Sequence, residues 1–264
     1  MLAVDTVYNE DCLQGMKRIA DGSVDMILTD LPYGVLDPQS GWDCPPPLPA
    51  LREEFLRIIK SNGAVCLFGS GRFTLELGEV FKDYFKYKFV WVKQTASGFI
   101  NCKYRPLTAH EDILIFSKGT AAPRASNNMV YNPQGLIEVN QRRGNGKRRF
   151  GTVAGRRPCN AKYADYICKY INYPRDTLKF NALPSKRLHT SQKPTDLLEY
   201  LIKTYTNEGE LVLDATIGSG STAVAAINTN RHFIGFETEK KFYDIANKRI
   251  SKAYVDKEQL LIKE

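Results

Sequence analysis

Short apolar runs alternate with amphipathic stretches along most of the chain. The run VDMILT at 24–29 and the run LVL at 211–213 each end at an aspartate. Runs of this kind are typical of strands that are buried on both faces of a parallel sheet. The stretches between such runs repeat apolar residues every three or four positions, as helices packed on a sheet do. The pattern therefore predicts an α/β fold with a doubly wound, mostly parallel sheet and right-handed crossovers.

The alternation is interrupted once, between about 119 and 187. Elsewhere, the turn residues Ser61–Gly63 are expected to precede the strand at 61–70. Thr195 is expected to cap the helix at 195–205, which follows the interruption. We predict two halves of one domain, 1–118 and 188–264, separated by an inserted region at 119–187. Strands are predicted within 5–8, 24–30, 61–70, 88–94, 112–118, 210–214 and 232–236, and helices near 13–19, 51–59, 71–85, 195–205, 221–227 and 238–250.

Composition narrows the class of protein. The chain is 43% hydrophobic and 25% charged, and its apolar runs are far shorter than the roughly 20 residues that cross a bilayer. Its start lacks the basic and apolar regions of a secretory signal. Six scattered cysteines without a CxxC pair indicate reduced thiols, and three histidines give no metal-binding pattern. We therefore expect a cytoplasmic protein without a metal site.

The net charge of +8 is concentrated in one region. Residues 118–187 contain 15 Lys+Arg and 3 Asp+Glu, a net of +12, so the remaining 22 basic and 26 acidic residues give −4. A local excess of this kind is typical of a surface that binds a polyanion, although a solvated basic surface is the alternative. The predicted DNA-binding residues are the cations of QRRGNGKRRFGTVAGRR at 141–157, namely Arg142, Arg143, Lys147, Arg148, Arg149, Arg156 and Arg157.

A glycine loop follows the strand that ends at Asp214. Gly218 and Gly220 precede an Ala-rich helix, and Glu237 ends the next strand 23 residues after Asp214. Glycines let a ligand approach the backbone, and a carboxylate at this distance suits ribose hydroxyls. Asp214 would repel a pyrophosphate but suits a cofactor with a cationic group. The order therefore favours an adenosine-containing cofactor over a ligand-free turn.

The strand at 24–29 ends in Asp-Leu-Pro-Tyr-Gly. A turn can use Asp, Pro and Gly, but it does not need Tyr33. An aromatic ring beside the carboxylate of Asp30 instead suits a flat, polar substrate such as a base.

Three motifs of this chain, and their order, resemble those of β-class DNA amino-methyltransferases, especially the adenine enzymes of phages and prophages. DLPY at 30–33 resembles their D-P-P-Y box, and DATIGSGST at 214–222 resembles their S-adenosyl-L-methionine loop. HTSQKP at 189–194 is similar to the H-P-x-Q-K-P segment before that loop. The box comes first, the basic region lies in the middle and the loop comes last, as in the β class. Leu31 stands where the family usually has its first Pro.

The resemblance implies a circularly permuted, seven-stranded methyltransferase sheet with target recognition by 119–187. It implies methyl transfer from S-adenosyl-L-methionine to N6 of adenine in double-stranded DNA. The carboxylate of Asp30 and the carbonyl of Leu31 would accept the amine hydrogens of a flipped base. Pro32 would stiffen the turn, and Tyr33 would stack on the base. The cofactor would be held by Asp11, Gln192, Lys193, Asp214, Gly218, Gly220, Ser221, Thr222 and Glu237.

Alternatives remain open at this stage. Asp rather than Ser at position 30 favours adenine over N4 of cytosine, which is the second candidate. A DNA-binding relative without catalysis is the third candidate. Trp42, Phe99 and Tyr104 flank the box, where a packing role and DNA contact suit them equally. His110 and Glu111 before DILIF are interpreted as the entry of a strand rather than as an acid–base pair. The recognition sequence, a restriction partner, a homodimer and a phage origin, with the host cytoplasm as location, are not decided by the sequence.

Overall fold

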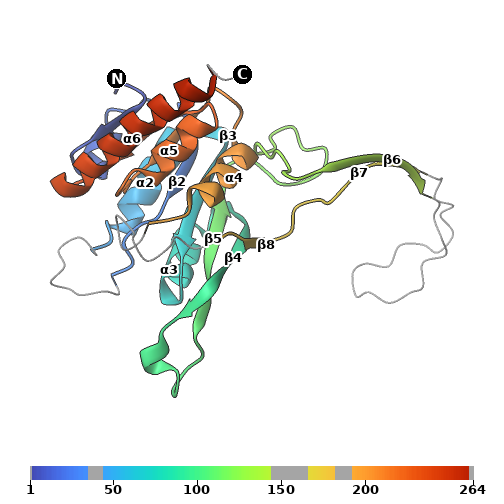
Figure 1. Ribbon diagram of the computed structural model, residues 1–264, viewed down its shortest axis with the longest axis horizontal. Helices are drawn as coiled ribbons and strands as arrows, with labels where there is room; N and C mark the ends of the chain where they lie inside the picture. The colour runs from blue at the N-terminus through green and yellow to red at the C-terminus, as the bar shows by residue number, and fades with distance from the viewer. Residues whose placement is uncertain (1, 35–43, 144–165, 182–191, 262–264) are drawn as a thin grey trace. The chain divides into compact units, whose positions relative to one another are not determined.

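The computed structural model describes residues 2–34, 44–143, 166–181 and 192–261 (Figure 1). It divides into two compact units, Met1–Asn132 with Asp176–Glu264, and Pro133–Arg175. The second unit contains a two-stranded antiparallel sheet of β6 (Ile137–Arg143) and β7 (Tyr166–Ile171). It lies within the region 119–187 where the alternation of strands and helices breaks, while residues 119–132 and 176–181 belong to the first unit.

The first unit contains an eight-stranded sheet in the order β1-β10-β9-β2-β3-β5-β4-β8. Among these strands only β5 runs against its neighbours. This confirms the predicted α/β class and the mostly parallel sheet. The strands are β1 (Thr6–Tyr8), β2 (Val24–Thr29), β3 (Ile59–Gly69), β4 (Phe85–Ser97), β5 (Thr108–Phe116), β8 (Thr177–Lys179), β9 (Leu211–Asp214) and β10 (His232–Phe236).

Helices cover both faces of this sheet because its strands are apolar on both sides. Successive residues of a strand point to opposite faces, so Met26 and Leu28 join one core cluster and Ile27 joins the other. The first cluster includes side chains of α4 (Thr195–Tyr205), α5 (Ser221–Asn228) and α6 (Lys240–Leu261). The second includes side chains of α1 (Cys12–Met16), α2 (Leu48–Ile58) and α3 (Arg72–Val80).

Three local expectations change in the structure. The sheet has one strand more than seven, because β8 adds to the edge at β4, where Trp91 Nε1 donates to the carbonyl of Phe180 (3.0 Å). The turn expected at Ser61–Gly63 is an irregularity inside β3, which begins directly after α2. Thr195 is not the cap of α4: Pro194 holds that position with an extended backbone and no side-chain capping bond.

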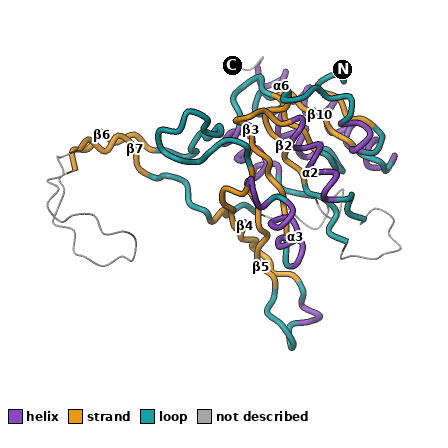
Figure 2. Tube along the Cα trace, turned by 180° about the vertical axis from the view of Figure 1, so that it is seen from behind, coloured by secondary structure: helices purple, strands orange, loops and turns teal. Residues whose placement is uncertain are grey.

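The β4–β5 hairpin extends beyond α3, as both views show (Figures 1 and 2). Its register shifts between Val92 and Ser97, where β4 has more residues than the opposing part of β5. Such a bulge bends a strand and increases its twist. No helix among the described residues is both long and apolar enough to span a bilayer. The cysteines in the described part of the chain are free.

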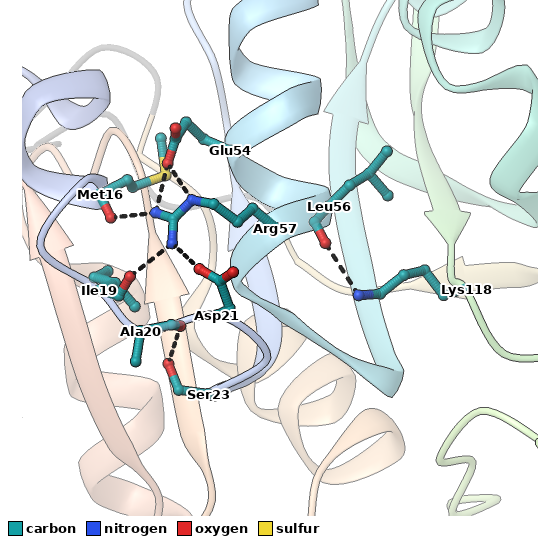
Figure 3. Close-up of polar contacts among 9 residues, drawn as sticks. All are labelled: Met16, Ile19, Ala20, Asp21, Ser23, Glu54, Leu56, Arg57 and Lys118. Atoms are coloured by element: carbon teal, nitrogen blue, oxygen red, sulfur yellow. Dashed lines mark hydrogen bonds and ion pairs between the residues drawn. The ribbon is translucent and has the colours of Figure 1, made fainter.

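Arg57, near the end of α2, holds the connection between α1 and β2 (Figure 3). Its guanidinium donates to the carbonyls of Met16 and Ile19, both at 2.8 Å. It also donates to the carboxylates of Asp21 (2.5 Å) and Glu54 (2.7 Å). Met16 is the last residue of α1, and its carbonyl also accepts from the main-chain nitrogen of Ile19 (2.9 Å), so the guanidinium gives a second donor to a carbonyl at the helix end.

Arg57→Met is expected to lower the free energy of unfolding by about 1–3 kcal/mol, because the carbonyl of Ile19 and the two carboxylates lose this donor, while the carbonyl of Met16 still accepts from the nitrogen of Ile19. Urea denaturation measures this loss. Arg72→Met is the matched control, since its side chain is 89% exposed and forms an i,i+4 ion pair with Glu76. The control is expected to lose less than about 0.5 kcal/mol. Equal losses in the two variants would contradict the role given to Arg57.

Candidate active site

The carboxyl ends of β2, β9 and β10 border one cavity of about 1320 Å³. Doubly wound sheets bind ligands at this edge, where neighbouring connections leave for opposite faces. Sites for one drug-sized ligand measure roughly 300–1,000 Å³, so this cavity has room for a cofactor and a second flat molecule. The predicted residues that line it are Asp11, Asp30, Leu31, Pro32, Tyr33, Gln192, Lys193, Asp214, Gly218, Ser221, Thr222 and Glu237.

The segment after β2 is fixed to the segment after β9. Thr216 Oγ1 lies 3.0 Å from Thr29 Oγ1 and donates to the main-chain carbonyl of Asp30 (3.0 Å). The side chain of Leu31 is buried in the apolar cluster that also contains Phe73. Leucine therefore anchors this turn by packing at the position where a proline would restrict the backbone.

Asp30 belongs to a buried cluster of charges. Lys193 Nζ donates to Asp30 Oδ2 and lies 3.4 Å from Glu111 Oε2. Lys93 Nζ donates to Glu111 Oε1. The four side chains are between 9% and 20% exposed, so solvent screens them weakly. Two carboxylates and two ammonium groups balance one another at the floor of the cavity.

Burial and pairing act in opposite directions on these groups. Burial raises the pKa of Asp30 and the Glu111 charge adds to this, while Lys193 opposes it. Burial alone would raise the pKa of Glu111, but Lys193 and Lys93 bring it below its usual value. Burial would lower the pKa of Lys193, and the two carboxylates raise it instead. Lys193 therefore stays charged and favours the ionised form of both neighbours.

Tyr33 is oriented by two contacts. Its hydroxyl donates to Asp30 Oδ1 (2.9 Å). Its ring stacks on Phe73 of α3, with centroids 4.8 Å apart and planes inclined by 26°. Burial, then the charge of Asp30, raises the pKa of Tyr33 well above its usual value, so the hydroxyl remains a donor. The ring thus borders the cavity in a fixed orientation.

The loop between β9 and α5 bends through two left-handed glycines. Gly220, with φ of 81°, is the N-cap of α5, and a Cβ there would lie 3.0 Å from that of Ala246. Gly218 has φ of 52°, and a Cβ there would have only one heavy atom, a carbonyl oxygen at 4.0 Å, within reach. Gly220 is therefore required for packing, whereas Gly218 borders open space in the cavity.

Asp214 fixes both ends of the glycine loop by hydrogen bonds. Its Oδ1 accepts from the main-chain nitrogen of Thr216 (3.1 Å) and its Oδ2 from Thr222 Oγ1 (2.6 Å). Burial raises its pKa to about 6, although these hydrogen bonds oppose the shift. From α6, Arg249 donates to the carbonyl of Ser219 (2.6 Å) and to Ser221 Oγ (3.0 Å).

Two further carboxylates face the cavity from strand and helix ends. Glu237 follows β10, and its Oε1 accepts from the main-chain nitrogen of Glu239 (2.8 Å). Burial raises the pKa of Glu237, and main-chain donors, including that of Gly218, oppose this. Asp11 is the N-cap of α1, where its Oδ1 accepts from the nitrogen of Gln14 (3.1 Å).

The predicted DNA-binding cations lie apart from this cluster in the chain. Arg142 and Arg143 are at the end of β6, and the side chain of Arg142 is exposed. Lys147, Arg148, Arg149, Arg156 and Arg157 lie outside the described residues, as does Trp42. Among the described residues, no group of three or more His, Cys, Asp or Glu is placed to hold a metal ion.

Several site residues were not identified from the sequence. Glu111 does lie on a strand, but its side chain reaches the cavity and pairs with Lys193. Phe73, Thr216 and Arg249 act as supports for Tyr33, Asp30 and the glycine loop. An acid just before an apolar run was the signal for Glu111. Thr216 lies within the motif DATIGSGST, and nothing local marked Phe73 or Arg249.

Comparison with known proteins agrees with this geometry. The N6/N4 methyltransferase family model, described as DNA methylase, matches residues 24–248. The Type II methyltransferase M1.MboII of Moraxella bovis is 24% identical over 272 residues, which cover 94% of this chain and 96% of that protein. Among solved structures, the M1.HpyAVI–SAM complex has a TM-score of 0.60 at 24% identity, covering 93% of this chain and 98% of that one. The cytosine-N4-specific PvuII DNA methyltransferase has a TM-score of 0.65 at 15% identity, covering 94% and 90%.

The raised pKa of Asp214 predicts a pH-dependent stability. Between the usual aspartate value of 3.8 and about 6, the folded protein binds this proton more tightly than the unfolded chain. The free energy of unfolding contributed by Asp214 is therefore highest below the lower value and is lost as the pH rises through the upper one. The loss amounts to about 2–3 kcal/mol. Urea denaturation across this pH range measures the free energies of unfolding of the wild type and of Asp214→Asn. The wild-type value minus the variant value is expected to fall by that amount, and a constant difference would contradict the raised pKa of Asp214.

Proposed function

The chain belongs to the N6/N4 DNA methylase family, and from that premise we propose that it methylates N6 of adenine in double-stranded DNA. The coarser activity, DNA methyl transfer with S-adenosyl-L-methionine as cofactor, is that of the family. The observation that supports an exocyclic amine as the target is the position of Asp30, and aspartate rather than serine there favours adenine. Its buried carboxylate lies at the end of β2, beside an oriented aromatic ring and in the same cavity as the glycine loop.

The residues around the glycine loop fit this cofactor. The open space at Gly218 allows a ligand to approach the backbone closely. The carboxylate of Glu237 is held near that glycine by main-chain donors and suits ribose hydroxyls. Asp214 and Asp11 add negative charge, which favours a cofactor that carries an ammonium and a sulfonium group. Bound there, S-adenosyl-L-methionine supplies an activated methyl group to a nucleophile.

The exocyclic amine of a base is a weak nucleophile because its lone pair is delocalised into the ring. We assign Asp30 and the main-chain carbonyl of Leu31 as acceptors for the two amine hydrogens. Each carboxylate oxygen has two lone pairs, so an oxygen that already accepts from Tyr33 or Lys193 can accept once more. Held by both acceptors, the nitrogen becomes tetrahedral and its lone pair is free to attack. The proton that the methylated amine then loses can pass to Asp30.

Tyr33 offers a stacking surface to a base that has left the duplex. Stacking on an aromatic side chain contributes roughly 1–3 kcal/mol per base. Phe73 and the hydroxyl contact to Asp30 fix the ring before the base arrives. A ring that is already oriented loses little conformational entropy when the base binds.

Lys193 and Glu111 act through Asp30 as positioning residues. An unpaired carboxylate at this depth would become protonated, and a protonated Asp30 would offer one fewer acceptor to the amine. Lys193 supplies the compensating charge and directs Oδ2, while Glu111 and Lys93 hold Lys193 in place. We infer that Lys193 favours the ionised form of Asp30 against burial and the charge of Glu111.

N4 of cytosine is the second candidate for the target amine. The likeness to the cytosine-N4-specific PvuII enzyme, at a TM-score of 0.65, supports a common fold for both reactions. The two amines have the same chemistry, so the acceptors alone do not choose between them. Asp at position 30, where cytosine enzymes more often carry Ser, favours adenine.

The basic region 119–187 is proposed as the target-recognition region. Its cations, including Arg142 and Arg143 on β6, would bind phosphates and make the affinity for DNA depend on salt. Double-stranded DNA as substrate follows from the family. A homodimer remains a proposal.

Wild-type protein incubated with S-adenosyl-L-methionine and unmethylated DNA is expected to yield N6-methyladenine. Mass spectrometry of the nucleosides identifies the product, and sequencing of the methylated DNA identifies the target site. Asp30→Ala is expected to abolish transfer while binding of the cofactor changes by less than about threefold, because Asp30 serves the amine. N4-methylcytosine would correct the base. Turnover by the variant would remove the role of Asp30.

Lys193→Met is expected to move the acidic limb of the rate profile to higher pH. Without the ammonium, burial and Glu111 raise the pKa of Asp30 further, and activity needs its ionised form. On the acid side, the rate falls about tenfold for each pH unit by which the limb moves. Single-turnover rates between about pH 6 and pH 9 measure this displacement.

The matched control is Lys60→Met, which removes a lysine–aspartate pair (Asp25 Oδ1, 2.6 Å) at the opposite end of β2. The pH–rate profile of Lys60→Met should match that of the wild type. In Lys193→Arg, the acidic limb of the profile should return most of the way to its wild-type position. A slower Lys193→Met enzyme with an unmoved profile would mean that Lys193 supports the fold alone.

A further inference from the structure

The end of the β4–β5 hairpin is a hydrogen-bonded structure. Gly98 adopts a left-handed conformation with φ of 89° and begins the short helix Phe99–Asn101. The main-chain nitrogens of Tyr104 and Arg105 both donate to the carbonyl of Asn101, at 2.9 and 3.0 Å. Residues 98–107, here called the hairpin tip, therefore have a backbone that is ordered by turn and helical hydrogen bonds.

The hairpin tip exposes large apolar side chains that its own fold does not bury. Phe99 is 78% exposed, Ile100 94% and Tyr104 89%. Phe99 and Tyr104 therefore do not pack in the core of the described part of the chain, and DNA contact stays a prediction for both. Three neighbouring apolar side chains on one projecting element mark a contact surface rather than scattered exposure.

Charge identifies the kind of partner. Residues 84–110 contain five Lys+Arg and no Asp or Glu. Two of these cations, Lys103 and Arg105, lie in the hairpin tip between and beside the exposed aromatic rings. Interleaved aromatic and basic side chains without acids suit a partner with stacked rings and phosphates.

The hairpin is continuous with the active-site cavity. Ser97, Arg105 and Thr108 line that cavity, and so do His110 and Glu111 further along β5. Phe99 follows Ser97 by two residues, and Tyr104 directly precedes Arg105. A nucleic acid that delivers a base into the cavity would thus pass the hairpin tip.

We propose that the hairpin tip inserts its apolar side chains into the DNA duplex beside the flipped base, with Lys103 and Arg105 on the flanking phosphates. The proposal rests on the proposed function and extends it to how the base is extracted. A base that leaves the stack exposes the faces of its neighbours and leaves a gap. Apolar wedges that enter base steps compensate for lost stacking and hold the distorted duplex.

The test compares Phe99→Ala/Tyr104→Ala with a matched control. Leu75→Ala removes a side chain that is 73% exposed on α3, outside both the hairpin tip and the cavity lining. The duplex contains the target site found by sequencing DNA methylated by the wild type. A fluorescent base analogue at the methylated position reports extrusion of the base, and titration reports affinity. Calorimetry with S-adenosyl-L-homocysteine reports the cofactor site, and light scattering reports the mass.

The double variant is expected to bind the duplex at least about tenfold more weakly, since two aromatic rings no longer stack on bases. Its fluorescence gain should largely disappear, while binding of S-adenosyl-L-homocysteine stays within about twofold. The control should match the wild type in every measurement. Lys103→Ala/Arg105→Ala should reduce the slope of log affinity against log salt by about 1.8, or 0.9 for each phosphate that the protein no longer neutralises.

Wild-type affinity and base extrusion in the double variant would overturn the proposal. A change from dimer to monomer that accounts for the weaker binding would also overturn it, because the hairpin tip would then bind a second copy of the chain. If wild-type protein neither methylates nor binds any DNA, the proposed function itself fails and the wedge fails with it. The wild-type measurements separate that case from a failure of the hairpin proposal alone.

Discussion

The parallel pairing of β2 with β9 is the constraint on which the site depends. These strands come from opposite ends of the chain, yet Met26 pairs with Val212 and Ile27 with Leu213. Their connections continue to β3 on one side and to β10 on the other, so a crevice opens between them. The hydrogen bond from Thr216 to the carbonyl of Asp30 crosses this crevice. A slip of one residue would turn Asp30 to the other face of the sheet.

The charge of Lys193 opposes the rise that burial causes in the pKa of Asp30. Taking a carboxylate out of water costs several kcal/mol unless it is paired. Lys193 pairs with Asp30 and also approaches Glu111, so each charge depends on the next. The arrangement contributes more to a defined geometry than to stability. A change of one member therefore alters the protonation of its neighbours as well as their positions.

Local patterns predicted those residues of the cavity lining that lie at strand ends. Asp30, Asp214 and Gly218 follow apolar runs, and the pattern of a run is enough to place its end. Glu111 could not be placed, because its nearness to Asp30 depends on β5 pairing with β3 rather than with β4 alone. The stacking of Phe73 on Tyr33 depends likewise on how α3 packs. The N-cap of α4, Pro194, directly follows Lys193, so its backbone depends on how Lys193 is held.

The distribution of charge separates two tasks. In the cavity, Lys93 and Lys193 are matched by Asp30 and Glu111, so its floor offers no net attraction to a phosphate. Residues outside 118–187 carry 22 basic and 26 acidic side chains, and such a surface repels DNA on balance. Outside 118–187, the stretch 84–110 is an exception, because it is basic and contains no Asp or Glu. Residues of this stretch also line the cavity. On our proposals, the backbone of a nucleic acid is therefore attracted to the hairpin and to the basic region, while the carboxylates of the cavity lining disfavour a phosphate there.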